Sequence, residues 1–282
     1  MKWNKATLRK ISEHENDKFK IFEFADFVDY WAKNGGGAHN RGIDEWAGGS
    51  FADTVNVCKL GDLAAVNEAE KLADMICDSV DVSGLVPSWR LDVSGAFACV
   101  PEYLAGSPEC MYNQCPVQST ASPLDMAICI TVSWKMDQAE MRRRGVCLLA
   151  AAMAINRVRP VNLWLYSNAY FERPLVRLSS RFDVSEVCAA LTRPAVSRHL
   201  FVGYSYNALI SACHPKWCYG VPLLEWDQET AKRKLVELGG LSHDCLVLTN
   251  KIGEWANMER AAFVEELNGM IRNVASVDSV AA

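Results

Sequence analysis

The sequence has no hydrophobic run that could cross a membrane. Its longer apolar stretches, such as residues 146–155, are far shorter than the ~18 to 20 residues that span a bilayer. The first residues are highly charged and contain neither an apolar signal core nor a small-residue cleavage site. We therefore expect no membrane association and no secretion.

Recognisable catalytic motifs are also missing. The chain contains neither a phosphate-binding P-loop nor the Gly-rich fingerprint of dinucleotide-binding folds. Residues 203–207 approach the nucleophile elbow of hydrolases, but they end on Asn207 instead of glycine, and the acid of His243-Asp244 follows the histidine. The sequence therefore predicts a protein that is not an enzyme and needs no cofactor.

Cysteine is abundant, with 11 residues, but its pattern does not indicate a disulfide framework. The number is odd, and most cysteines lie scattered in apolar stretches, which is typical of buried thiols in a reducing compartment. Cys110 with Cys115 and the run 213–218 could together supply four zinc ligands, but neither has the tight spacing of a zinc knuckle. We predict no metal site.

Hydrophobic periodicity divides the chain into two parts. In residues 1–125, apolar side chains from Ile21 to Trp31 and from Leu63 to Val80 recur at helical spacing, with Asp62 as the expected N-cap of the second helix. The tetrapeptide Asp-Val-Ser-Gly occurs at 81–84 and 92–95 and favours turns between short strands. This part reads as a helical and irregular elaboration.

Residues 126–282 alternate between strand and helix patterns. A strand over 127–134, a helix over 138–158 and a strand over 161–166 form a βαβ unit, in which the two strands are parallel. The remaining segments predict strands at 200–204 and 245–249, and helices at 184–191, 228–238 and 255–274. We expect a single α/β domain over 1–282, with a central, mostly parallel sheet and helices on both faces.

Charge is strongly segregated within a net charge of -5. Residues 21–133 carry 5 basic and 16 acidic side chains, whereas residues 134–216 carry 12 basic and 5 acidic ones. Arginine predominates among these middle cations, and a guanidinium can hold a phosphate with two hydrogen bonds or stack on a flat ring. Aromatic residues are interleaved with them, so a basic groove for a polyanion is one reading. The other is that the middle cations neutralise the acids of 21–133 inside the fold.

The groove hypothesis places its binding residues in the basic middle, near the expected carboxyl ends of strands. The candidate nucleic-acid-binding residues are Trp134, Lys135, Arg142, Arg143, Arg144, Arg173, Arg177, Arg181, Arg198, Tyr204, Tyr206, Lys216, Trp217 and Tyr219. Arginines would contact phosphates and aromatic rings would stack on bases, at ~1 to 3 kcal/mol per base.

Two resemblances add to this reading. Residues 127–134, the following helix and residues 246–250 resemble a von Willebrand factor A domain in outline, but Lys135 and a missing aspartate depart from its metal motif. Residues 46–54 and 105–111, with Met141-Arg142-Arg143-Arg144-Gly145, resemble a family of tailed-bacteriophage proteins, and in particular the single-stranded-DNA-binding cofactors of RNA polymerase in N4-related phages.

The phage resemblance implies binding to melted promoter DNA and recruitment of a phage RNA polymerase, in the cytoplasm of the infected bacterial host. Its partners would be single-stranded DNA and that polymerase, and homo-oligomerisation stays open. The alternative is a phage interaction or assembly factor that binds protein and no nucleic acid.

Overall fold

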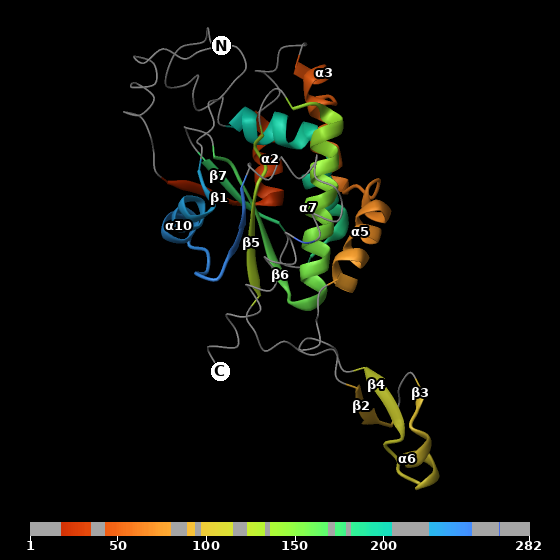
Figure 1. The fold of residues 1–282 in the computed structure, drawn as a ribbon. Helices are drawn as coiled ribbons and strands as arrows, with labels where there is room; N and C mark the ends of the chain where they lie inside the picture. Colours follow the sequence, from red (N-terminus) through yellow and green to blue (C-terminus); the bar gives the residue numbers. More distant parts are fainter. Residues whose placement is uncertain are drawn as a thin grey trace.

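The computed structural model describes residues 18–34, 43–79, 89–93, 97–114, 123–132, 136–168, 173–178, 182–204, 226–249 and 265. Within them, five strands form one sheet in the order β1-β7-β6-β5-β8 (Figure 1). The strands are β1 (Phe19–Glu23), β5 (Leu124–Cys129), β6 (Val161–Tyr166), β7 (Arg173–Arg177) and β8 (Leu246–Leu248). Only the β6–β7 pair is antiparallel, which confirms a mostly parallel sheet in an α/β fold.

Helices cover both faces of this sheet, and the apolar side chains of β5 are buried on both faces. Met126 and Ile128 pack into the core formed with α7 (Gln138–Val158), whereas Ala127 and Cys129 pack with α10 (Gln228–Gly239) on the opposite face. The long α7 is the crossover of the β5–α7–β6 unit, and its bounds and those of β6 are the ones expected from the sequence. Figure 1 shows α7 and α10 on opposite sides of the sheet.

The N-terminal elaboration is helical, as expected, and packs against the α7 face. Its helices are α2 (Phe24–Asn34), α3 (Ile43–Ala47), α4 (Phe51–Leu60) and α5 (Val66–Ser79), and α5 lies along α7 (Figure 1). Phe27 and Trp31 of α2 and Ile76 of α5 are fully buried in the same core as α7. Helix α8 (Val184–Thr192) also packs on α7.

Helices α7 and α8 approach closely at Gly145. A Cβ added at this position would lie 2.7 Å from the carbonyl carbon of Leu191 and 2.8 Å from the Cα of Thr192. Both neighbours are backbone atoms of α8, so neither can rotate away. The glycine of the Met-Arg-Arg-Arg-Gly segment is therefore required for helix packing.

Several predicted elements differ from the structure. The strand expected at 200–204 overlaps the end of a π-helix, η1 (Val196–Val202), which is buried almost throughout. A short apolar run does not by itself distinguish a strand from a buried helix. The strand expected at 127–134 runs from 124 to 129. Ile21, expected in one helix with Trp31, lies in β1, and Asp62 lies four residues before α5 and is not its N-cap. Elements β1, β7, α3 and α4 were not predicted. The predicted helix over 255–274 lies outside the described residues, except for helical Glu265.

Residues 89–93 and 97–114 contain a second, three-stranded antiparallel sheet. Its order is β2 (Trp89–Asp92), β4 (Met111–Gln114), β3 (Phe97–Ala98), and the short helix α6 (Val100–Leu104) connects β3 to β4. We call these residues the small sheet unit. Figure 1 shows it apart from the five-stranded sheet. None of the described helices combines the length and apolar character needed to span a bilayer.

Candidate functional site

The carboxyl ends of β5 and β6 meet in a buried polar network. The hydroxyl of Thr131 donates a hydrogen bond of 2.6 Å to the side-chain oxygen of Asn168, and both residues are buried. Ser197 donates to the carbonyl oxygen of Ile130 (2.8 Å), and Arg144 donates to that of Cys129 (2.7 Å). In the described residues these polar groups at the ends of β5 and β6 are therefore hydrogen-bonded within the protein.

Burial sets the ionisation of this network. It raises the pKa of the Cys129 thiol, raises that of the Tyr166 hydroxyl well above its usual value, and lowers that of the Arg144 guanidinium. The thiol and phenol therefore stay neutral, and neither is an activated nucleophile. The adjoining cavity of about 10 Å³ has room for about one water molecule. Its lining consists of Ile130, Val132, Met141, Arg144, Leu191, Arg193, Pro194 and Ser197.

Four predicted contact residues lie in the interior. Arg144, Arg173, Arg198 and Tyr204 expose 5%, 0%, 5% and 3% of their surface, so their assignment to an open groove was wrong. Arg173 packs its guanidinium 5.1 Å from the centre of the Trp226 ring. These arginines are held by carbonyl oxygens and aromatic rings from distant parts of the chain, which sequence spacing does not reveal.

Tyr204 belongs to a cluster of aromatic side chains formed with β1 and α2. Its ring centre lies 5.8 Å from that of Phe22, 5.9 Å from those of Phe27 and Tyr30, and 6.4 Å from that of Trp31. Tyr204 is helical and lies two residues after η1, and its side chain is buried in the core. It is not available to stack on a base.

Five cations of the basic middle form ion pairs with carboxylates elsewhere in the described part of the fold. Three of those carboxylates belong to the acidic segment 62–74: Arg142 pairs with Glu68 (3.3 Å), Arg157 with Asp74 (2.6 Å), and Arg193 with Asp62. Arg159 pairs with Asp244 (3.1 Å), and Arg177 lies 3.9 Å from Glu23. Four of these pairs thus join the basic middle to acids of residues 21–133, two of them where α5 lies along α7.

Among the candidate cations that the structure describes, Arg143 keeps an exposed position. Arg143 is exposed in the first turns of α7, next to half-exposed Arg142. The remaining predicted residues lie outside the described residues: Trp134, Lys135, Arg181, Tyr206, Lys216, Trp217 and Tyr219. The same holds for Cys115 and for the 213–218 run considered as zinc ligands. Among the described side chains, no group of three or more His, Cys, Asp or Glu residues could hold a metal ion.

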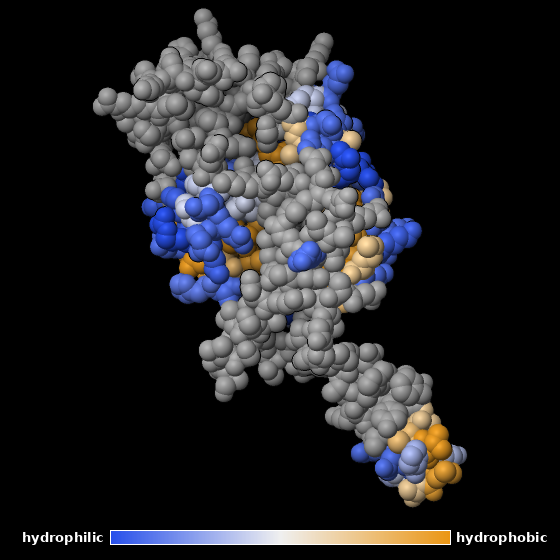
Figure 2. Space-filling view, viewed as in Figure 1, coloured by the Kyte–Doolittle hydropathy of each residue, from blue (hydrophilic) through white to orange (hydrophobic). Residues whose placement is uncertain are grey.

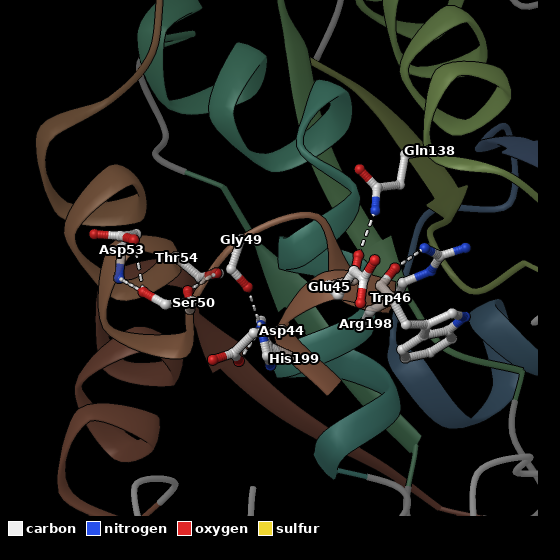
Figure 3. Close-up of polar contacts among 10 residues, drawn as sticks. All are labelled: Asp44, Glu45, Trp46, Gly49, Ser50, Asp53, Thr54, Gln138, Arg198 and His199. Atoms are coloured by element: carbon white, nitrogen blue, oxygen red, sulfur yellow. Dashed lines mark hydrogen bonds and ion pairs between the residues drawn. The ribbon is translucent and has the colours of Figure 1, made fainter. Parts of the chain in front are cut away.

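The segment 46–54, one of those that carried the phage resemblance, has a structural role around α3. Arg198 of η1 donates hydrogen bonds to the carbonyl oxygens of Trp46 and Met136. Gln138, at the start of α7, donates to the carbonyl oxygen of Glu45 (2.6 Å), and His199 donates to that of Gly49 (2.8 Å). Figure 3 shows these side chains converging on α3 and the turn that follows it. The arrangement fastens α3 to the core.

The turn after α3 is built to begin α4. Gly48 has a φ of 90°, which a residue with a side chain rarely adopts, and Ser50 is the N-cap of α4, accepting a hydrogen bond from the backbone N–H of Asp53 (3.1 Å). The Ser50 hydroxyl in turn donates to the Asp53 carboxylate (2.6 Å). Serine is a common N-cap residue, so Ser50 is a sequence signal for this helix start, although α4 was not predicted.

A different surface stands out on the small sheet unit. Val93, Val100, Tyr103 and Leu104 are 67%, 61%, 66% and 78% exposed, and three of them belong to α6. They are four of the ten large hydrophobic side chains that the described residues expose. Figure 2 shows hydrophobic colour on part of this unit. We call these four residues the α6 surface. Sequence reasoning did not find it, because a five-residue helix shows no periodicity.

A protein-family model supplies the class to which this fold and sequence belong. The model, described as a domain of unknown function (DUF7192), matches residues 11–243. The chain therefore belongs to this family. No curated protein and no solved structure matches it. The description of this family specifies no activity.

Proposed function

We propose that this protein is an interaction factor that binds a partner protein through the α6 surface. The observation that carries the proposal is the exposure of Val93, Val100, Tyr103 and Leu104 on one small unit. Exposed apolar side chains lose contact with water when a partner covers them, and this burial stabilises the complex by about 25 cal/mol per Å² of apolar surface. Apolar side chains already buried in the core of the protein gain nothing further from a partner.

The charges near the α6 surface indicate the chemistry of its partner. Glu102 lies within α6 and Glu109 is exposed on the connection to β4, whereas residues 97–114 contain no lysine or arginine. A matching surface would be apolar at its centre and basic at its rim. Binding would then weaken only modestly with added salt, because the apolar contact supplies most of the affinity.

The experiment compares two matched exposed leucines. Leu104 of α6 is 78% exposed and Leu60, at the end of α4, is 85% exposed, so aspartate at either position should leave folding intact. Proteins retained from a nuclease-treated host lysate by the unmodified chain and by Leu60→Asp, but lost with Leu104→Asp, would support the proposal. Equal retention by all three chains would contradict it.

Binding to single-stranded DNA is the second candidate function. It is favoured by the position of Arg142 and Arg143 in the first turns of α7, just beyond the carboxyl end of β5. Lys135 and Trp134 lie in the short segment between these elements in the sequence. A polyanion site here would be smaller than the groove expected from the sequence, because Arg144, Arg173 and Arg198 are buried.

A gel-shift titration tests this second function. If the protein binds oligonucleotides, log affinity should fall with log salt with a slope of about -0.7 per phosphate contact, and Arg143→Ala should make that slope shallower. Arg233→Ala, which removes an exposed cation of α10, is the control. Absence of binding at ~50 mM salt would exclude the function.

The two surfaces lie on different elements, so one molecule could use both. Holding single-stranded DNA at the α7 start and a protein at α6 would amount to recruitment, the activity that the resemblance to phage polymerase cofactors implies. A ternary complex with a phage RNA polymerase on melted promoter DNA, lost with Leu104→Asp, would support this combined role. DNA binding without polymerase retention would leave only the DNA-binding part.

A further inference from the structure

Two cysteines lie opposite each other in the small sheet unit. Strands β3 and β4 pair antiparallel, with Phe97 opposite Tyr112 and Ala98 opposite Met111. Continuing this register by one residue places Cys99 opposite Cys110, and the backbone N–H of Cys99 donates a hydrogen bond of 2.7 Å to the carbonyl oxygen of Cys110. Directly opposed residues point to the same face of a sheet. The two side chains therefore share a face.

The spacing of this pair suits a covalent link. Opposed residues joined by such a hydrogen bond have Cα atoms about 5.5 Å apart, and disulfides span Cα separations of roughly 4.4 to 6.8 Å. Their Cβ atoms must approach by about 1 Å from the usual cross-strand distance. The hairpin can tighten here, because Cys99 has already left β3 and serves as the N-cap of α6.

The accessibility of the two thiols differs. Both are free in the structure; Cys110 is partly exposed, whereas Cys99 is only 7% exposed. A soluble oxidant would therefore reach Cys110 first, and Cys99 would act second. No other pair of cysteines in the described residues is placed opposite in a strand register.

We propose that Cys99 and Cys110 form a reversible disulfide that closes the loop carrying α6. The oxidant is a small disulfide such as oxidised glutathione. The Cys110 thiolate attacks one sulfur of that disulfide, forms a mixed disulfide and releases the first reduced glutathione. The Cys99 thiolate then attacks the Cys110 sulfur and releases the second. Two protein thiols lose their protons and become one S–S bond, and the two released glutathione thiolates take up those protons.

The link would constrain the α6 surface. Val100, Tyr103 and Leu104 all lie between the two cysteines, in a loop held otherwise by backbone hydrogen bonds such as that from Ala105 N–H to the Pro101 carbonyl oxygen. A unit this small has little core to keep its loop ordered, and a cross-link of its ends limits the conformations that the loop can adopt. Formation of the link requires only the hairpin register and does not depend on what the α6 surface binds.

Peptide mapping of the full-length protein tests the proposal. The reduced protein is treated with oxidised glutathione without denaturant, alkylated, and digested with trypsin and a Glu-specific protease. Cleavage after Arg90 and Glu102 isolates Cys99 in the peptide 91–102, and cleavage after Glu109 and Lys135 gives the peptide 110–135. We expect these two peptides joined, with a mass two hydrogen atoms below their sum and with fragment ions that assign the link to Cys110.

Two variants make the result decisive, because the peptide 110–135 also contains Cys115 and Cys129. The link should persist in Cys115→Ser and disappear in Cys110→Ser. Persistence of the link in Cys110→Ser would overturn the proposal. So would recovery of the peptide 91–102 unlinked, or carrying only glutathione, from oxidised protein whose circular dichroism spectrum is unchanged.

Discussion

The guanidinium carbon of Arg198 lies 4.3 Å from the centre of the Trp46 ring, in a segment 152 residues earlier in the chain. The same arginine donates to the carbonyl oxygens of Trp46 and Met136. It thereby joins η1 to α3 and to the start of α7. Arg198, which the sequence analysis predicted to contact nucleic acid, thus holds these three segments together.

The first prediction follows from this geometry. Arg198→Lys should lower the free energy of unfolding by about 1 to 3 kcal/mol, because an ammonium lacks the planar fork that reaches two carbonyl oxygens while stacking on a ring. Urea denaturation followed by tryptophan fluorescence measures the change. Arg233→Lys, on an exposed face of α10, is the control and should shift the midpoint little. Equal stability of the two variants would show that Arg198 does not hold α3.

Adjacent arginines of α7 should behave oppositely. Arg144 is buried and donates to the Cys129 carbonyl oxygen, so Arg144→Ala should cost about 2 to 4 kcal/mol by leaving that acceptor unsatisfied beside a cavity. Arg143 is exposed, and Arg143→Ala should stay within about 0.5 kcal/mol of the parent. Thermal unfolding of the two single variants is the test. A larger loss for Arg143 would mean that α7 is rotated relative to this structure.

The close approach of α7 and α8 gives a third prediction. Gly145→Ala should destabilise the protein by about 1 to 3 kcal/mol, because the new methyl group would press on the α8 backbone at Leu191 and Thr192. At Gly49 the nearest atom to an added Cβ is the Ala195 Cβ at 3.9 Å, so Gly49→Ala is a matched control with a small expected effect. Comparing the two denaturation midpoints decides between contact and open space at position 145.

Acid should destabilise the fold through its hydrogen-bonded aspartates. Burial raises the pKa of Asp125, but the backbone N–H of Ser242 and the side chains of Trp164 and Asn162 donate to its carboxylate, and the net pKa lies below the ordinary value. At Asp62 burial is likewise outweighed by the bond from Arg193 and by backbone N–H groups.

The direction of the pH effect follows from these lowered pKa values. A carboxyl group that binds its proton more weakly in the folded state stabilises the fold fully above its unfolded pKa of about 4, and this contribution is lost as the pH falls through the folded value. We expect the free energy of unfolding to decrease below about pH 4, and to decrease less steeply in Asp125→Asn. Denaturation series at several pH values measure both slopes. Identical slopes would show that Asp125 is not a source of the effect.

Local sequence patterns determined much of the main fold. The apolar periodicity of 138–158 and the apolar run of 161–166 gave α7 and β6 with their observed bounds, and those of 184–191 and 228–238 gave α8 and α10 to within one residue at the C-terminal end. These elements repeat their signal over several turns or strand residues. By contrast, β7 begins and ends with arginine, so its pattern resembles an exposed loop although four of its five residues are buried.

The sequence by itself determined a mostly parallel α/β sheet, because helix and strand periodicities are local and each apolar face requires a covering layer. Only the tertiary structure decided what the basic middle does. The sequence shows arginines at 144, 173 and 198, but the environment of each depends on carbonyl groups and rings brought close by folding. Likewise Arg142, Arg157 and Arg193 meet acids of segment 62–74 only because α5 packs on α7 and α4 on α8. The charge of a segment can be counted from its sequence, whereas the partner of each charged side chain is set by contacts between residues far apart in the sequence.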